Sequence, residues 1–179
     1  TLKYVGERGS KLAPEIIRAV GISVPVHLES SCHEISTWEN YLYLRRFLKT
    51  LQAKTIGKRA LLPPEIDLTR VKNSRDFFQF DDAATAPIHG FASAIDYYTR
   101  CSSLQYLPGI AIPTLLLNAQ DDSFLSERCY PEKLAADHPH LHLMVSPYGG
   151  HVGFVEFSPS GHYWSELRIR EFLTATEGG

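Results

Sequence analysis

The sequence has little of what marks several special classes of protein. None of its apolar runs approaches the roughly 18 residues that a membrane-spanning helix needs. Its formal net charge is only -2, so the charge balance predicts neither a nucleic-acid partner nor bulk attraction to a membrane. No succession of basic, apolar and small residues indicates a secretory signal peptide. What is left is an ordinary globular composition, in which 44% of 179 residues are hydrophobic.

Cysteine is scarce too. The three cysteines, Cys32, Cys101 and Cys129, are odd in number and far apart in the chain. They fit neither a Cys-x-x-Cys metal pattern nor a disulfide framework, so we expect no metal or other cofactor. A reducing compartment is the simpler interpretation, and it predicts a cytoplasmic location.

The chain also lacks an initiator methionine, because it begins at Thr1 and its one methionine is Met144. Its first residues are typical of the end of a helix, with Gly6 and Gly9 as stop signals. We therefore expect the sequence to be a fragment of a longer protein.

Three apolar runs predict strands. The run AVGISVPV, from Ala19 to Val26, is rich in β-branched residues and short enough to be a buried strand. A second strand is predicted from Thr114 to Leu117, and a third in HLHLMVSPYGGHVGF, which ends in a glycine turn. Helices are predicted between the last two strands, beside Pro131, and after the third, roughly from His162 to Thr174.

The segment between the first two strands, about 29–109, is predicted to be mostly helical. Apolar side chains at three- and four-residue steps indicate an amphipathic helix. SRDFFQFDDAATAPIHGF is irregular and rich in aromatic residues, whereas ASAIDYYTRCSSL indicates another helix. The residues that define the amphipathic helix are Trp38, Tyr41, Leu44, Leu48 and Leu51.

The order of elements predicts an α/β fold. Alternating strands and helices favour about three parallel strands joined by right-handed crossovers, with helices on both sides. Functional residues in such folds lie in loops beyond the carboxyl ends of the strands. Asp121 and Asp122 follow the second strand and His151 follows the third, so these side chains should meet at one edge of the sheet.

A carboxylate and an imidazole at neighbouring strand ends are two members of a nucleophilic triad. The carboxylate fixes the tautomer of the imidazole, which takes a proton from the nucleophile and returns it to the leaving group. Glycines around His151 would let the backbone turn tightly. In α/β-hydrolases the nucleophile comes first, then the acid and then the histidine, and here both Asp121 and Asp122 precede His151.

Two segments carry a specific resemblance. FDDAATAPIHGFASAIDYYTRCSSLQYLPGIAIPTLLLNAQDDSF and the later YGGHVGF resemble the YheT-like family of α/β-hydrolases, which includes esterases, abhydrolase-domain lipases and medium-chain acyltransferases. The resemblance covers essentially the whole chain and implies the C-terminal part of that fold. It implies Asp122 as the triad acid and His151 as the base, with Ser123 where many members have proline. Asp121 would be the acid if the register were shifted by one.

No Gly-x-Ser-x-Gly motif exists in the chain. Ser23 in GISVP is the nearest candidate, but no helix with a glycine elbow follows it directly. The resemblance implies that the nucleophile lies just upstream of Thr1 and that the N-terminal half of the same protein is missing. It further implies that 1–28 holds the end of the nucleophile helix, a short helix and a core strand. Residues 29–109 would be a helical cap insertion with a core helix, and 110–179 the C-terminal core with the acid and histidine loops.

These expectations define a function and two alternatives. The principal hypothesis is a serine hydrolase for carboxylic, acyl or lipid-like esters, with an ester substrate, no nucleic-acid partner and little activity in this chain alone. The first alternative is a non-catalytic module, because the acid-free segment 40–64 carries six basic residues that could contact a membrane or protein. A charged outer face of a cap helix is its simpler explanation. The second alternative is a metal site in HPHLH, whose histidines at 138, 140 and 142 lack an obvious further ligand.

Overall fold

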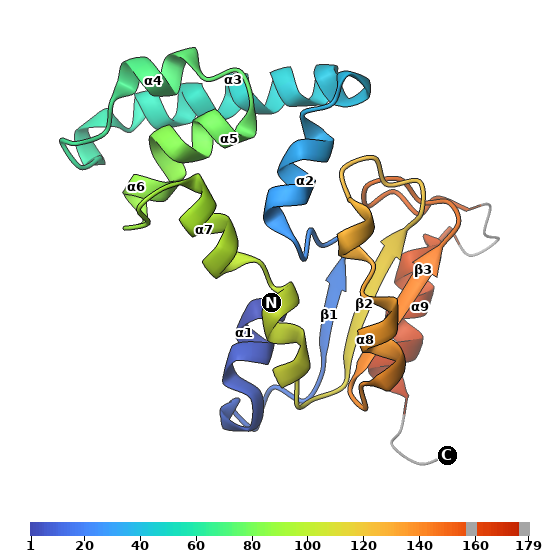
Figure 1. Cartoon of the computed structure of the whole chain (residues 1–179). Coiled ribbons are helices and arrows are strands. Elements are labelled where there is room, and N and C mark those ends of the chain that lie inside the picture. Colours follow the sequence, from blue (N-terminus) through green and yellow to red (C-terminus); the bar gives the residue numbers. More distant parts are fainter. Residues whose placement is uncertain (157–160, 176–179) are drawn as a thin grey trace. The chain divides into compact units, whose positions relative to one another are not determined.

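The computed structural model describes residues 1–156 and 161–175 (Figure 1). The chain forms two compact units. The first, here called the sheet unit, comprises Thr1–Val26 and Ser103–Gly179, and the second, the helical unit, comprises His27–Ser102. Both candidate catalytic side chains belong to the sheet unit, so its construction decides the geometry of the site.

The sheet unit is built on three parallel strands in the order β1-β2-β3 (Figure 1). They are β1 (Ala19–Ile22), β2 (Thr114–Ala119) and β3 (Leu141–Ser146). Thr114 pairs with both Ala19 and Leu141, so the three strands are in register at their start. The α/β class and the parallel sheet are thus confirmed. The first strand is shorter than predicted, because Ser23 adopts a φ of 50° and turns the chain out of the sheet.

Both faces of the sheet are covered. On one face, Leu2 and Val5 of α1 (Leu2–Arg8) pack with Leu116, together with η5 (Leu104–Gly109) and α8 (Glu132–Asp137). On the other face, α9 (Trp164–Thr174) packs against Leu115 and Leu117. Every residue of β2 is buried, which explains its run of three leucines, Leu115 to Leu117. Each fully buried leucine contributes roughly 1.5–3 kcal/mol, so this strand anchors the unit.

The two N-terminal glycines play different parts. Gly9 does end α1, with a φ of 50°, as the sequence predicts. Gly6 does not, because α1 continues through it to Arg8. A Cβ at Gly6 would overlap the backbone carbonyl of Tyr106, and one at Gly109 would overlap the carbonyl of Gly6. Gly6 therefore serves the close approach of α1 to η5 and is no stop signal.

The helical unit contains the two helices that the sequence predicts and further helices that it did not single out. The segment predicted to be irregular forms a helical run in which the Asp76 side chain accepts a hydrogen bond from the Gln79 backbone at 2.7 Å. The prediction was wrong there because this cap and buried aromatic packing are not visible as periodicity. The elements of the unit are α2 (Leu28–Ile35), η2 (Trp38–Asn40), α3 (Tyr41–Gly57), η3 (Arg59–Leu61), α4 (Leu68–Asn73), α5 (Phe77–Phe80), η4 (Asp81–Thr85, a π-helix), α6 (Ala86–Ile88) and α7 (Ala94–Cys101).

The predicted amphipathic helix is α3, and it begins later than the spacing suggests. Leu44 and Leu48 are buried in the core of the unit, beside Val71 and Phe80. Trp38 lies before the helix, in η2, and is 83% exposed. The apolar face of α3 is therefore narrower than the sequence pattern indicates. Within the residues that the structure describes, no helix combines the length and the apolar character needed to cross a bilayer.

Candidate active site

The acid turn begins where β2 ends. The Gln120 backbone N–H donates to the Ser146 carbonyl at 2.8 Å and so extends the parallel pairing with β3 by one residue. The chain then turns sharply at Asp122, whose N–H donates to the Ala119 carbonyl at 3.3 Å. One carboxylate oxygen of Asp122 accepts from the Phe124 N–H at 3.0 Å. This local bond is typical of an aspartate in a turn, and it fixes the direction of the carboxylate.

The histidine loop, 149–154, follows β3 and has an unusual backbone. Gly150, Val152 and Phe154 have φ values of 54°, 62° and 46°. The loop closes on itself, because the N–H groups of Gly153 and Phe154 both donate to the Gly149 carbonyl, at 3.1 and 2.9 Å. Its end is anchored by Phe154, which is 2% exposed and stacks on Trp164 with a centroid distance of 5.9 Å. A Cβ at Gly149 would collide with the Phe154 ring, so glycine is needed there.

The two loops bring His151 and Asp122 together. His151 Nδ1 lies 2.9 Å from the second carboxylate oxygen of Asp122. The Asp122 side chain is completely buried, whereas the His151 side chain is 38% exposed. The imidazole also contacts the ring of Phe124, with a centroid distance of 4.8 Å. The arrangement is a buried carboxylate hydrogen-bonded to a partly exposed imidazole.

The chemistry of this pair follows from its donors and acceptors. An ionised carboxylate only accepts hydrogen bonds, so Nδ1 of His151 carries the proton and donates it to Asp122. In the neutral imidazole, Nε2 then has a free lone pair that can accept a proton from a substrate or a nucleophile. A positive charge developing on the ring would be stabilised by the buried carboxylate. An imidazole and a carboxylate in this arrangement can act together as a general base.

Asp121 has a different partner from Asp122. Its Oδ1 accepts a hydrogen bond from the Gly150 backbone N–H at 2.7 Å. Of the two adjacent aspartates, Asp122 binds the imidazole and Asp121 binds the loop that carries it. Asp122 is thus the aspartate that partners His151, in the register that the family resemblance implies.

Ser23, the in-chain nucleophile candidate, lies at the end of β1. It is 3% exposed, and its Oγ accepts a hydrogen bond from the Val152 backbone N–H at 3.2 Å. Its own N–H donates to the Leu117 carbonyl at 2.8 Å. Its hydroxyl is thus engaged with the backbone beside His151 and has little access to a substrate.

Two residues that support the site were missed at the sequence level. Asn118 is buried in β2, accepts from the Val24 N–H at 3.3 Å and donates to the Cys129 carbonyl at 2.9 Å. The Tyr130 hydroxyl donates to the Ala119 carbonyl at 2.5 Å, just before the acid turn. Burial is the main reason that the pKa of Tyr130 is raised to about 12, and the nearby Asp122 charge adds to it. The Tyr130 hydroxyl therefore keeps its proton and donates it in this hydrogen bond. The polar Asn118 in an otherwise apolar strand was the one available signal.

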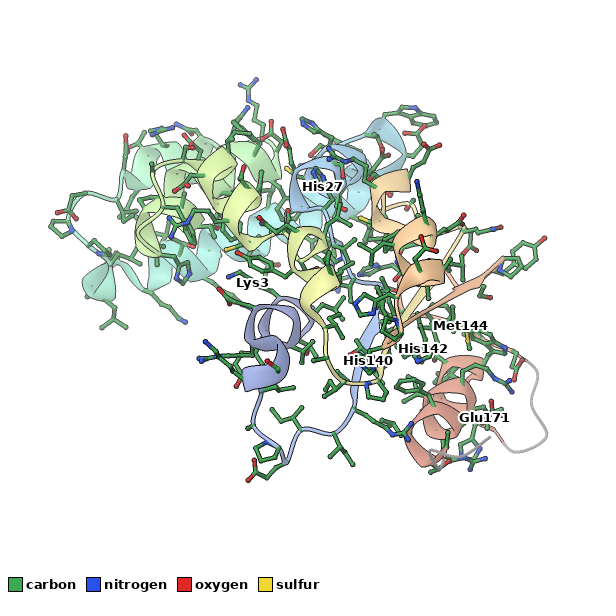
Figure 2. All side chains as sticks on the ribbon, turned by 60° about the horizontal axis from the view of Figure 1, so that its bottom comes forward. Lys3, His27, His140, His142, Met144 and Glu171 are labelled. Carbon is green, nitrogen blue, oxygen red and sulfur yellow. The ribbon has the colours of Figure 1, made fainter. Side chains whose placement is uncertain are left out.

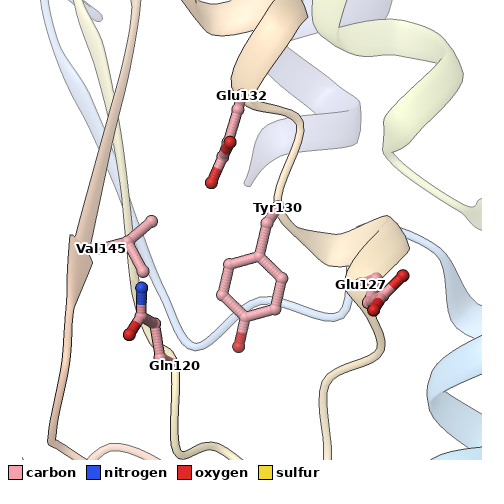
Figure 3. Close-up of a pocket in the computed structure, with 5 residues that line it drawn as sticks. All are labelled: Gln120, Glu127, Tyr130, Glu132 and Val145. Atoms are coloured by element: carbon pink, nitrogen blue, oxygen red, sulfur yellow. The ribbon is translucent and has the colours of Figure 1, made fainter.

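A pocket of about 310 Å³ lies beside the acid turn (Figure 3). Figure 3 shows Tyr130 between Gln120 and Glu127, with Glu132 and Val145 completing the lining. Neither Asp122 nor His151 lines it, so this pocket is not a binding cleft for a group that reacts at the imidazole.

The histidine-rich segment has structural contacts. His138 Nδ1 accepts from the N–H groups of His140 and Leu141, at 3.1 and 3.0 Å, and so caps the start of β3. The ring of His142 packs on Phe172 of α9, with a centroid distance of 5.7 Å. His140 and His142 lie together at the start of β3 (Figure 2). Among residues 1–156 and 161–175, no group of three or more His, Cys, Asp or Glu side chains could hold a metal ion.

The helical unit holds a buried polar cluster of its own. The Tyr98 hydroxyl donates to the Asp81 carboxylate at 2.6 Å and lies 3.2 Å from the Cys32 sulfur. The Thr85 hydroxyl also donates to the Asp81 carboxylate, at 2.5 Å. Burial raises the pKa values of Tyr98 and Asp81, and it raises that of the Cys32 thiol to about 11. All three cysteines of the chain, which lie in the described part, are free thiols. A thiol with so high a pKa is a poor nucleophile, so Cys32 is structural.

Comparison with curated proteins gives several relatives. The chain is 36% identical over 159 residues to "Putative esterase YheT" of Escherichia coli (strain K12), an alignment that covers 87% of this chain and 46% of that protein. It is 32% identical over 156 residues to "Phospholipase ABHD3" of Mus musculus, covering 87% of the chain and 38% of the relative. It is 30% identical over 116 residues to "Monoacylglycerol lipase ABHD2" of Homo sapiens, covering 62% and 27%.

The chain thus spans about half the length, or less, of these curated relatives. No protein-family model matches the chain, and neither does a solved structure. The relatives carry names of ester-cleaving enzymes, and the alignments with the first two extend over most of the chain.

Proposed function

The chain belongs to the YheT-like family of α/β-hydrolases, and on that premise we propose that it supplies the acid and the base of a serine hydrolase. The substrate class is carboxylic esters with acyl or lipid-like groups, as the names of the relatives suggest. Asp122 is the acid and His151 the base. The nucleophilic serine is supplied by a segment that precedes Thr1 in the complete protein.

One observation carries this proposal. A hydrogen bond of 2.9 Å joins His151 Nδ1 to a completely buried Asp122 carboxylate, while the His151 side chain is 38% exposed and its Nε2 is not used by that bond. Placing a carboxylate out of water is costly unless hydrogen bonds stabilise it, which here come from His151 and the Phe124 N–H.

The reaction follows from these positions. Nε2 of His151 accepts the hydroxyl proton of the serine as its oxygen bonds to the ester carbonyl carbon. The imidazolium then gives that proton to the leaving alkoxide, and the carbon–oxygen bond of the ester breaks to leave an acyl-serine. In the second half, His151 deprotonates water or an acceptor alcohol, which releases the acid or transfers the acyl group. Proton transfer of this kind contributes on the order of 10² to 10⁴ in rate.

Two observations support a nucleophile outside this chain. The chain contains no Gly-x-Ser-x-Gly, and it spans 46% of the length of the YheT relative. Ser23, the candidate nearest to a nucleophile motif in the sequence, uses its oxygen as the acceptor for the Val152 N–H. This chain alone should therefore show little or no esterase activity.

The remaining parts take their roles from the same comparison. We propose that 1–28 contains the end of the nucleophile helix and a core strand, and that 29–109 is a cap insertion with a core helix. Residues 110–179 then form the core with the acid and histidine loops. Cytoplasmic location remains a prediction from the free thiols.

A second function is favoured by one surface of the helical unit. Trp38 and Leu42 are 83% and 79% exposed, and Arg45, Arg46 and Lys49 are exposed on the same helical stretch. Exposed apolar and basic side chains together are typical of contact with an anionic membrane. Sedimentation with phosphatidylserine vesicles tests this: binding that is lost in a triple charge reversal at Arg45, Arg46 and Lys49, but kept in Lys133→Glu, supports it. A non-catalytic binding module additionally requires the complete protein to lack esterase activity.

The direct test of the principal proposal uses the complete protein. It should hydrolyse p-nitrophenyl acyl esters and be inactivated by a fluorophosphonate that bonds to one serine. Peptide mass spectrometry should find the label on a serine N-terminal to Thr1. A label on Ser23, or failure of the probe to label the active protein, would overturn the assignment of the nucleophile.

A further inference from the structure

Three consecutive residues of the histidine loop are held by three different side chains. The Gly150 N–H donates to Asp121 at 2.7 Å, the His151 ring bonds to Asp122 at 2.9 Å, and the Val152 N–H donates to Ser23 at 3.2 Å. Only the middle bond involves the imidazole. The outer two grip the backbone on either side of it.

The loop needs such support because its backbone is strained. Val152 has a φ of 62°, which β-branched residues adopt only at a cost, and Phe154 has a φ of 46°. A conformation of this kind persists only when its surroundings determine it from several sides. The packing of Phe154 on Trp164 fixes the end of the loop, whereas Asp121 and Ser23 fix the part that carries His151.

The two anchors are themselves attached to the sheet. Ser23 leaves β1 with a φ of 50°, and its N–H bonds to Leu117 of β2. The next residue, Val24, donates to the side chain of Asn118, so the turn at Ser23 cannot shift independently of β2. Asp121 follows Gln120, whose N–H pairs with Ser146 of β3. Ser23 and Asp121 thus hold the histidine loop in a fixed position relative to the ends of the strands.

We propose that Asp121 and Ser23 are positioning residues of the active site, which hold the histidine loop by its backbone so that His151 stays on Asp122. This inference rests on the proposed function for its kinetic consequence but not for its structural one. Asp121 acts as a hydrogen-bond acceptor and Ser23 as a second acceptor, and neither takes part in proton transfer. The adjacent aspartates therefore divide their work: one orients the ring and the other orients its loop.

The geometry separates this role from that of a nucleophile for Ser23. A nucleophilic hydroxyl must be reachable by substrate and must give its proton to the free nitrogen of the histidine. Ser23 is 3% exposed and accepts a hydrogen bond from the residue after His151. Its left-handed backbone turns the hydroxyl toward the loop, which is what an anchor requires.

The test uses the complete protein with Asp121→Ala, Asp121→Asn, Ser23→Ala and Ser23→Gly. Asparagine keeps an acceptor oxygen at position 121, and glycine keeps the positive φ at position 23 without strain, so it guards against misfolding of the alanine variant. Matched controls are Asp137→Ala, which removes an exposed acid, and Thr114→Val, which removes a buried hydroxyl at the opposite end of the sheet.

The first readout is amide hydrogen exchange, which needs no activity. Exchange at Gly150 should accelerate about tenfold or more in Asp121→Ala and stay near wild type in Asp121→Asn, because only the former loses the acceptor. Exchange at Val152 should accelerate in both Ser23 variants. The controls should leave both amides unchanged. Unchanged protection of Gly150 in Asp121→Ala, or of Val152 in Ser23→Gly, would overturn the proposal.

The second readout is kinetic. Asp121→Ala and Ser23→Gly should each lower kcat about five- to tenfold with little change in KM, and Asp121→Asn should recover most of kcat. An Asp121→Asn enzyme as slow as Asp121→Ala would show that the charge matters and not the anchoring. Complete loss of turnover in Ser23→Gly together with loss of fluorophosphonate labelling would make Ser23 the nucleophile. If the wild-type protein cleaves no ester, the proposed function fails, while the exchange data still decide the anchoring.

Discussion

Replacing Asp122 with asparagine alters the side chain by one group and leaves its volume almost unchanged, yet the structure predicts a large kinetic effect. The two carboxylate oxygens accept from His151 Nδ1 at 2.9 Å and from the Phe124 N–H at 3.0 Å. An asparagine has one acceptor oxygen and one donor amide. In one orientation the amide NH₂ faces the imidazole. In the other it faces the Phe124 N–H, and two donors then oppose each other without a hydrogen bond.

The first orientation is damaging for catalysis, because an amide that donates to Nδ1 forces the imidazole proton onto Nε2. The nitrogen that should accept the serine proton is then occupied. The loss expected from the wrong tautomer is roughly 10³ to 10⁴ in kcat, which corresponds to about 4–5.5 kcal/mol of transition-state stabilisation. KM should change little, because Asp122 is completely buried and does not touch substrate.

The assay is steady-state hydrolysis of p-nitrophenyl acyl esters by the complete protein, with thermal unfolding as a check on folding. Asp121→Asn is the matched control, because it makes the same chemical change one residue earlier at a side chain that accepts from the Gly150 backbone. A folded Asp122→Asn protein that keeps a tenth or more of the wild-type kcat, or an Asp121→Asn protein that is the more damaged of the two, would refute the reasoning.

Three further predictions concern the rest of the chain. Gly6→Ala should lower the free energy of unfolding by about 1–3 kcal/mol or more, because its Cβ would overlap the Tyr106 carbonyl. Gly57→Ala should change that free energy by under about 1 kcal/mol, because the space around Gly57 is open. Urea titrations of the two variants measure the difference. With its pKa raised to about 11, Cys32 should react with a thiol reagent at pH 8 about 100-fold more slowly than an ordinary exposed thiol, and equal rates at Cys32 and in a denatured control would contradict this. Burial raises the pKa of Asp81, so the folded state keeps the carboxyl proton to higher pH than the unfolded state does. The stability that Asp81 contributes is therefore greatest below its unfolded pKa, at about pH 4. This contribution is lost as the pH rises through the pKa of Asp81 in the folded state. The stability of Asp81→Asn relative to wild type should therefore increase from pH 4 to pH 8, and a pH-independent difference would contradict the shift.

The sheet was predictable from the sequence because its signals are local and strong. Four consecutive apolar or β-branched residues open β2, and the alternation of strands with helices implied the parallel order that is observed. The end of β1 was not predictable, since Ser23 and Val24 continue an apolar run. The strand ends at the positive φ of Ser23, and a bond from Val24 to Asn118, 94 residues away, holds that turn.

The candidate site divides in the same way. Asp122 and His151 each follow a strand, so topology alone brings them to one edge of the sheet, and the structure brings them within 2.9 Å. The choice between Asp121 and Asp122 rested on the family resemblance, because their distances from His151 along the sequence differ by only one residue. The hydrogen bond between Ser23 and Val152 joins residues 129 positions apart, and no periodicity or motif in the sequence predicts it.

The central claim is that His151 is the base of an ester hydrolase, and the measurement that tests it most directly is the kcat of His151→Ala in the complete protein. The variant removes one of the two hydrogen bonds to the buried Asp122 carboxylate, so it should unfold at a lower temperature, and thermal unfolding checks that the assayed protein is folded. The account predicts a fall in kcat of roughly 10³ or more for a p-nitrophenyl acyl ester in the folded variant. A folded His151→Ala protein that turns over the ester at the wild-type rate would contradict it.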